Sequence, residues 1–150
     1  MLLNVKFANI LEWKSILQAI NEIAEEVMFI CNQEGITFRG LDSSHVSLLE
    51  ITFPRSSFIS FNCTSTFFGI SVSDFKTMIN SASNNDQIEL LIDTPNKMRI
   101  FINGNLQMKY DLNLIEKSSI NTPNPKINAS SKISLSPDIL IKIMSNIERV

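Results

Sequence analysis

The sequence is short of the residues that build most metal and redox sites. Its 150 residues include one histidine, His45, and two cysteines, Cys31 and Cys63. A single histidine excludes a multi-histidine metal site, and two isolated cysteines exclude the Cys-rich zinc modules. Each cysteine stands in an apolar stretch, so we expect two buried, reduced thiols. We expect neither a metal site nor a cofactor.

Glycine and long apolar runs are scarce as well. The four glycines stand singly, which excludes a phosphate-cradling loop. The first residues lack the basic leader and the cleavage site of a secretory signal. No uncharged apolar stretch approaches the roughly 18 residues needed to cross a bilayer. These absences predict an intracellular protein without a membrane partner.

Basic and acidic residues are nearly balanced in the sequence. The chain has 13 Lys and Arg against 15 Asp and Glu, a net charge of −2. This balance argues against a protein that holds nucleic acid by charge alone, although a local basic face is compatible with it. Apolar residues make up 44% of the chain and charged residues 19%, which favours a folded domain with a packed core.

Hydrophobic periodicity predicts two helices in the first part of the chain, over residues 10–26 and from Ser71 or Ser73 to about Ser81. Asn9 is the expected cap of the first helix. The first helix has an apolar face made by Ile10, Trp13, Leu17, Ile20 and Ala24. The second has an apolar side made by Phe75, Met78, Ile79 and Ala82.

Alternating and β-branched segments predict strands over residues 27–31, 36–39, 46–52, 58–63, 87–92, 98–102 and 106–115. Pro95-Asn96 and Asn103-Gly104-Asn105 are hairpin-type connections, so the last three strands are expected to form an antiparallel meander. Together with the two helices, these strands indicate an α+β domain.

A linker and a repeat follow. Residues 116–131 are rich in proline and small polar residues, which is typical of an extended linker, and Ile127 is an isolated apolar residue within it. A strand over 132–135 and a helix capped by Ser136 then repeat the opening of the chain. The apolar positions of this helix lie 127 residues after Trp13, Ile16, Leu17 and Ile20: they are Leu140, Ile143, Met144 and Ile147.

This repeat predicts a first domain over 1–115, a linker over 116–131 and the beginning of a second domain over 132–150. An amphipathic helix needs an apolar surface to cover it. We therefore expect the chain to be either a fragment of a longer two-domain protein or a naturally short form of one.

The densest polar cluster is Leu-Asp-Ser-Ser-His-Val at residues 41–46. If these residues are catalytic, the cluster suggests a hydrolase that uses Ser44 and His45. Sequence neighbours rarely adopt the geometry of a catalytic triad, and no glycine-rich nucleophile turn surrounds these serines. We favour a turn in which Asp and Ser bond the local backbone, and we expect no catalytic residues and no enzyme activity.

Residues 35–48, with their Asp-Ser-Ser-His-Val run, closely resemble the corresponding stretch of the proliferating cell nuclear antigen family, the DNA sliding clamps of archaea and eukaryotes. The opening strand and helix, Phe75-Lys76 and Tyr110-Asp111 support the resemblance, which extends over the whole chain. It implies an antiparallel sheet with two helices on one face, and a trimeric ring that encircles duplex DNA. The implied function is that of a DNA polymerase processivity factor, located in the nucleus of a eukaryote or virus, or in the cytoplasm of an archaeon.

The resemblance also implies three sets of site residues. Those facing DNA are Lys14, Gln18, Asn21, Lys76, Thr77, Asn80 and Lys142. A pocket for short peptides of DNA polymerases, nucleases, ligases and the clamp loader is formed by Leu41, His45, Val46, Leu48 and Ile127. The subunit edge contains Lys109, Tyr110 and Leu112.

Three alternatives remain open at this point. Val46 and Leu48 fit a plain hydrophobic core equally well. The ring partners are copies of this chain or paralogues, as in a checkpoint-type or heteromeric clamp. A stand-alone peptide-binding module without a DNA role shares the same sequence features.

Overall fold

The computed structural model describes residues 1–7, 10–44, 46–116 and 128–147. Its first part consists of two units with the same order of elements, strand–helix–three strands. The first unit contains β1 (Leu3–Phe7), α1 (Ile10–Asn21), β2 (Glu26–Asn32), β3 (Gly35–Leu41) and β4 (Leu48–Pro54). The second contains β6 (Thr66–Ser71), α2 (Val72–Asn80), β7 (Gln87–Thr94), β8 (Lys97–Asn103) and β9 (Gln107–Asn113). The short 3-10 helix η1 (Arg55–Ser57) and strand β5 (Phe58–Cys63) connect the two units.

The two units exchange their first strands. β1 pairs with β7 of the second unit, and β6 pairs with β2 of the first. In the described part of the chain this gives a five-stranded sheet in the order β5-β1-β7-β8-β9 and a four-stranded sheet in the order β4-β3-β2-β6. All strand pairs are antiparallel, and an isolated bridge between Gly69 and Ile115 links the sheets. Neither unit can therefore complete its sheet without the other.

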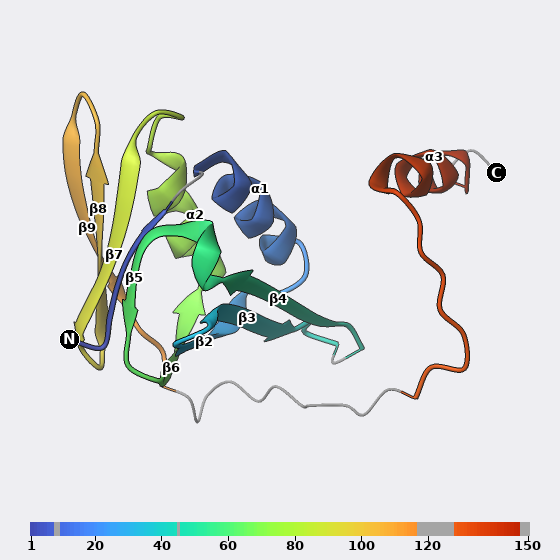
Figure 1. Cartoon of the computed structure of the whole chain (residues 1–150), viewed down its shortest axis with the longest axis horizontal. Coiled ribbons are helices and arrows are strands. Elements are labelled where there is room, and N and C mark those ends of the chain that lie inside the picture. Colours follow the sequence, from blue (N-terminus) through green and yellow to red (C-terminus); the bar gives the residue numbers. More distant parts are fainter. Residues whose placement is uncertain (8–9, 45, 117–127, 148–150) are drawn as a thin grey trace.

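The helices pack against each other on the inner side of both sheets (Figure 1). Trp13 of α1 is 1% exposed and stacks between Phe7 of β1, with ring centroids 3.9 Å apart, and Phe53 of β4, at 4.3 Å. Because Phe7 and Phe53 belong to different sheets, this one side chain joins the two halves of the core. Such parallel aromatic contacts add to the free energy gained by burial alone.

The α+β class and the placement of helices on one face are confirmed, while the predicted single sheet is two sheets. The predicted apolar face of the first helix is buried, but the helix ends at Asn21 instead of residue 26. Residues 26–32 form β2, which has a strand partner on each side. The strand predicted over 27–31 is thereby confirmed, and the predicted helix is too long by about its last turn. The second helix begins where it was expected, and Ser71 caps it by accepting a hydrogen bond from the Asp74 amide.

Strand β6 and the segment after residue 128 differ from the elements expected from the sequence. Strand β6 was not predicted, because its short sequence contains Gly69 and runs directly into the α2 cap. Residues 132–135 do not form the expected strand. The third helix, α3 (Pro137–Ile147), is present, and every one of its residues is exposed. Asn9 and residues 117–127 lie outside the described residues. No described helix is both long and apolar enough to cross a membrane.

Candidate functional site

Lys14 and Lys76 stand on the two neighbouring helices. Both side chains are half-buried. The Lys14 ammonium donates a hydrogen bond of 2.5 Å to the carbonyl oxygen of Ala82, just after α2. Lys14 therefore spans the boundary between the two helices, and its ammonium already has a carbonyl partner.

The other residues predicted to face DNA lie on the same two helices, apart from Lys142, which is exposed on α3. Gln18 donates to Glu22 at 2.7 Å, and the Thr77 hydroxyl donates to the Ser73 carbonyl at 2.8 Å. Asn80 is exposed. These side chains can offer hydrogen bonds to an anion, but two of them already have intramolecular partners.

Acidic groups offset the lysines of the helix surface. Each of α1 and α2 carries an acidic residue in its first turn, Glu12 and Asp74. Asn21 lines an open cavity of about 420 Å³ together with Glu25, Glu26, Ser71 and Ser73. The helix surface is thus polar with little net charge, which suits weak contact with phosphates better than tight binding.

The loop between β3 and β4 is organised by one carboxylate. Asp42 accepts hydrogen bonds from the Ser44 hydroxyl, from the Val46 amide at 2.8 Å and from the Ser47 amide at 2.7 Å. The Ser44 hydroxyl, followed by these backbone amides, lowers the pKa of Asp42 below its usual value. The predicted turn is observed, and Asp42 and Ser44 are both used to build it.

This loop presents apolar side chains to solvent. Val46 is 83% exposed and Leu48 is 36% exposed, while Leu41, the cross-strand partner of Leu48, is half-buried. The alternative that Val46 and Leu48 are core residues is therefore wrong. Neighbouring exposed aliphatic groups are typical of a contact surface. His45 and Ile127 lie outside the described residues.

Strand β9 forms one edge of the five-stranded sheet. Leu112 is 3% exposed and packs in the core, so its side chain is not available at this edge. Tyr110 is half-buried on the same face, with its hydroxyl 3.5 Å from the Met108 sulfur. Lys109 projects from the outer face, with its ammonium 6.0 Å from the centre of the Phe101 ring.

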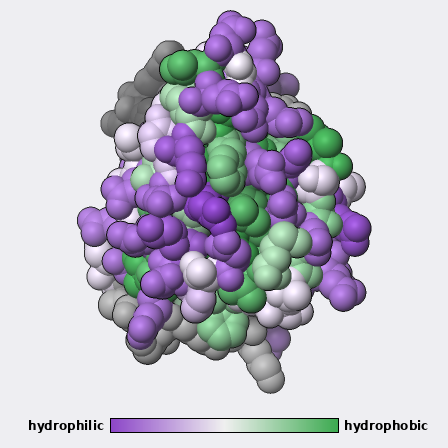
Figure 2. All heavy atoms as spheres, turned by 90° about the vertical axis from the view of Figure 1, so that its left-hand side faces the viewer, coloured by the Kyte–Doolittle hydropathy of each residue, from purple (hydrophilic) through white to green (hydrophobic). Residues whose placement is uncertain are grey.

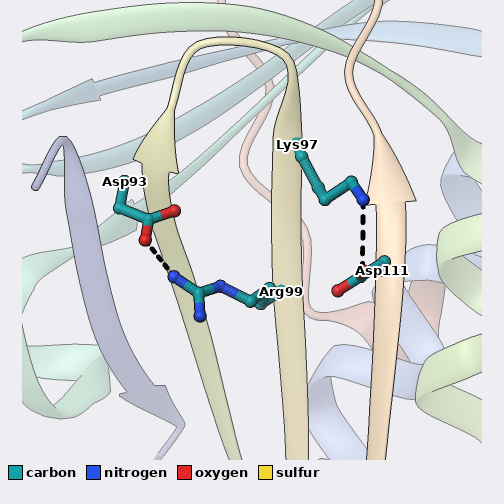
Figure 3. Close-up of polar contacts among 4 residues, drawn as sticks. All are labelled: Asp93, Lys97, Arg99 and Asp111. Carbon is teal, nitrogen blue, oxygen red and sulfur yellow. Dashed lines mark hydrogen bonds and ion pairs between the residues drawn. The ribbon is translucent and has the colours of Figure 1, made fainter.

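Paired charges run along the outer face of this sheet. Arg99 pairs with Asp93, and Lys97 pairs with Asp111 at 3.2 Å (Figure 3). Figure 2 shows this face as mostly hydrophilic, with hydrophobic side chains between the polar ones. These pairs are not evident from the sequence, because only the strand register shows which charges face each other. The described cations of this face are thus partly neutralised.

Comparisons with known proteins agree with this architecture. The family described as "Proliferating cell nuclear antigen, N-terminal domain" matches residues 2–122. A DNA polymerase sliding clamp of Nitrosopumilus maritimus is 39% identical over 138 residues, which cover 91% of this chain and 55% of that protein. The chain spans about half the length of the curated relatives it matches.

Solved structures share the fold. The proliferating cellular nuclear antigen of Entamoeba histolytica matches with a TM-score of 0.81 and 20% identity, over 99% of this chain and 61% of that one. The PCNA2–PCNA3 complex of Sulfolobus tokodaii matches with a TM-score of 0.74 and 24% identity, over 83% of this chain and 51% of that one.

Proposed function

The chain belongs to the proliferating cell nuclear antigen family, and from this membership we propose that it forms the amino-terminal part of a DNA sliding clamp. Such a clamp encircles duplex DNA and tethers a polymerase and other replication proteins to it, without chemistry of its own. Residues 1–115 are the first clamp domain, 116–131 the connecting linker and 132–150 the start of a second domain. The clamp acts where the DNA is, in the nucleus of a eukaryote or virus or in the cytoplasm of an archaeon.

The observation that carries this proposal is the layer of two packed helices on the inner side of both sheets (Figure 1). Lys14 and Lys76 belong to this layer, which in a ring lines the hole. Phosphate contacts add affinity in proportion to their number. A closed ring stays on DNA by its topology, so it needs only weak, sequence-independent contacts to slide. The small net charge of the helix surface fits this mode of binding.

The exposed side chains of the β3–β4 loop support a role in docking. A short peptide with aromatic or aliphatic anchors gains most of its affinity by burying them against such groups. Leu41, Val46 and Leu48 form the first-domain side of this surface, and His45 and the linker residue Ile127 complete it. Polymerases, nucleases, ligases and the clamp loader are the partners we assign to it.

The free edge of β9 supports ring formation. An edge strand offers unpaired backbone groups that another chain can extend by strand addition. Lys109 and Tyr110 flank this edge, and Leu112 contributes through its backbone. The neighbouring subunit is a second copy or a paralogue; the S. tokodaii structure, which unites two different clamp chains, favours testing both.

The test is topological. A fusion of this chain to the carboxy-terminal half of the N. maritimus clamp is incubated with a nicked circular plasmid and separated from free protein by gel filtration in high salt. We expect the fusion to elute with the circular DNA and to be released by one restriction cut, because a ring can leave a linear molecule by its ends. A fusion that is monomeric and never stays on circles contradicts the proposal. So does equal retention on circles and linear DNA.

Charge contact is tested separately in the same fusion. Replacing Lys76 by Gln should lower the slope of log affinity against log salt by about 1, as expected for one lost phosphate contact. The matched control is Lys97→Gln, which removes the same charge from the outer face of the sheet. If Lys76→Gln and Lys97→Gln change the salt slope equally, the helices do not form the surface that faces DNA. Peptide binding that persists without any retention on DNA would favour the stand-alone peptide-binding module.

A further inference from the structure

The two cysteines lie together where the two sheets meet. Cys31 belongs to β2 of the four-stranded sheet and is the cross-strand partner of Thr66 in β6. Cys63 ends β5 of the five-stranded sheet, opposite Leu3. Only two residues connect β5 to β6, so the chain crosses between the sheets directly beside β2. Because β6 pairs with β2, this crossing brings Cys63 close to Cys31, and each thiol shifts the pKa of the other. Both cysteines are free thiols and Cys31 is buried, as expected, whereas Cys63 is only half-buried.

The environments of the two thiols differ. Cys31 is 1% exposed, while Cys63 is half-buried and donates to the Thr64 carbonyl at 2.9 Å. The hydrogen bond from Cys31 lowers the pKa of Cys63, and the same bond, together with burial, raises the pKa of Cys31. A solvent-accessible thiol of low pKa beside a second thiol is the arrangement found in redox-sensing proteins.

We propose that Cys31 and Cys63 form a redox-responsive pair, which a peroxide converts into a disulfide that joins the two sheets. The Cys63 thiolate attacks one oxygen of hydrogen peroxide, the O–O bond breaks, and the leaving hydroxide takes up a proton to form water. The sulfenic acid on Cys63 is then attacked by the Cys31 sulfur. The S–O bond breaks, and the second hydroxide leaves as water with the Cys31 proton. Two thiols are oxidised and one peroxide is reduced to two waters.

The disulfide has a structural consequence. It closes a loop that contains β3, β4 and β5 and ties the four-stranded sheet to the edge of the five-stranded sheet. Loop closure restricts the unfolded chain. We expect oxidation to raise the Tm by about 10 °C and dithiothreitol to reverse the shift. This inference does not depend on the proposed clamp function.

The test uses the complete 150-residue chain treated with hydrogen peroxide and then digested with trypsin without reduction. Cys31 and Cys63 fall on different tryptic peptides, Ser15–Arg39 and Ser56–Lys76. We expect mass spectrometry to find these peptides joined, with the loss of two hydrogen atoms and without covalent dimers. Absence of the joined peptide, or disulfides only between molecules, would overturn the proposal.

Two variants separate the roles of the thiols. Cys63→Ser should lose both the joined peptide and the Tm shift. Cys31→Ala should stop at the sulfenic acid of Cys63, which dimedone traps. If Cys31→Ala fails to fold, Cys63→Ser still tests the proposal. Cys63 is half-buried at the end of a strand, where a serine can be accommodated. An unchanged Tm shift on oxidation of Cys63→Ser would overturn the proposal.

Discussion

At the scale of single residues, the Asp42 carboxylate holds the β3–β4 loop through its negative charge. Its pKa in the folded chain lies below the usual 3.8, so the charged form stabilises the loop. This contribution is fully present above that value and is lost as the pH falls through the lower, folded-state pKa. We therefore expect the Val46 and Ser47 amide protons to exchange faster with solvent as the solution is acidified to about pH 2.

The measurement is NMR of the amide protons against pH, relative to the intrinsic exchange rates and with the Ile100 amide in the core of the other sheet as internal reference. Asp42→Asn keeps an acceptor oxygen but cannot titrate in this range. Its loop amides should show no such transition. A transition at the same pH in this variant would assign it to another group.

Residue-level roles were predictable where they depend on near neighbours in sequence. The turn at Asp42 and Ser44 involves residues within five positions, and the burial of Trp13 follows from helical spacing. The contact between Cys31 and Cys63 and the bond from Lys14 to Ala82 join residues 32 and 68 positions apart. Such contacts depend on how the sheets meet and on how α1 lies against α2, which no local pattern contains.

At the scale of elements, the turn from α1 into β2 packs tightly on β3 at Gly40. A Cβ atom at this position would lie 2.6 Å from the Val27 side chain and 3.0 Å from the Ala24 side chain. Gly40→Ala should therefore lower the free energy of unfolding by about 1–3 kcal/mol through overpacking. Denaturant titration, followed by circular dichroism, measures this loss.

A double-mutant cycle identifies its cause. Val27→Ala removes the closest atom and leaves room for the new methyl group, so the two substitutions together should cost less than the sum of their separate effects. Strict additivity would show that the loss at Gly40 does not come from this contact.

The elements show where periodicity stops being informative. The apolar spacing of α1 continues past Asn21 to Ala24, yet the helix ends at Asn21 and the chain turns into β2, the strand predicted over 27–31. Strand β6 is likewise defined by its pairing with β2, since its own sequence passes directly into a helix cap. Hydrophobic spacing and alternation identified both helices and seven of the described strands, in which local pattern and sheet pairing agree: β2, β3, β4, β5, β7, β8 and β9.

At the scale of the whole molecule, the exchange of β1 and β6 makes the two strand–helix–meander units one folding body. The sequence predicts a repeat between the start of the chain and residues 132–150, of which the structure has the helix but not the strand, and it gives no sign of the repeat within the first domain. The two inner units share an order of elements rather than a run of matching residues. The candidate surfaces follow from this closure: the helix layer, the β3–β4 loop and the β9 edge lie at different places around one hydrophobic core (Figure 1).

The same architecture predicts that α3 adds nothing to the stability of this core. All described residues from 128 to 147 are exposed, including Ile133 at 82% and Ile147 at 63%. A chain ending at Glu116 should therefore unfold within about 2 °C of the 150-residue chain, because the described residues that it loses are all exposed and such residues change stability by about 0.5 kcal/mol or less. It should also bind less of an apolar dye, since the uncovered face of α3 is gone.

Deleting from Gln107 onward is the control: it removes β9 and uncovers Met98, Ile100 and Ile102, and should abolish cooperative unfolding. Calorimetry of the three chains decides, and a large loss of Tm in the chain ending at Glu116 would show that the segment after it packs on the first domain.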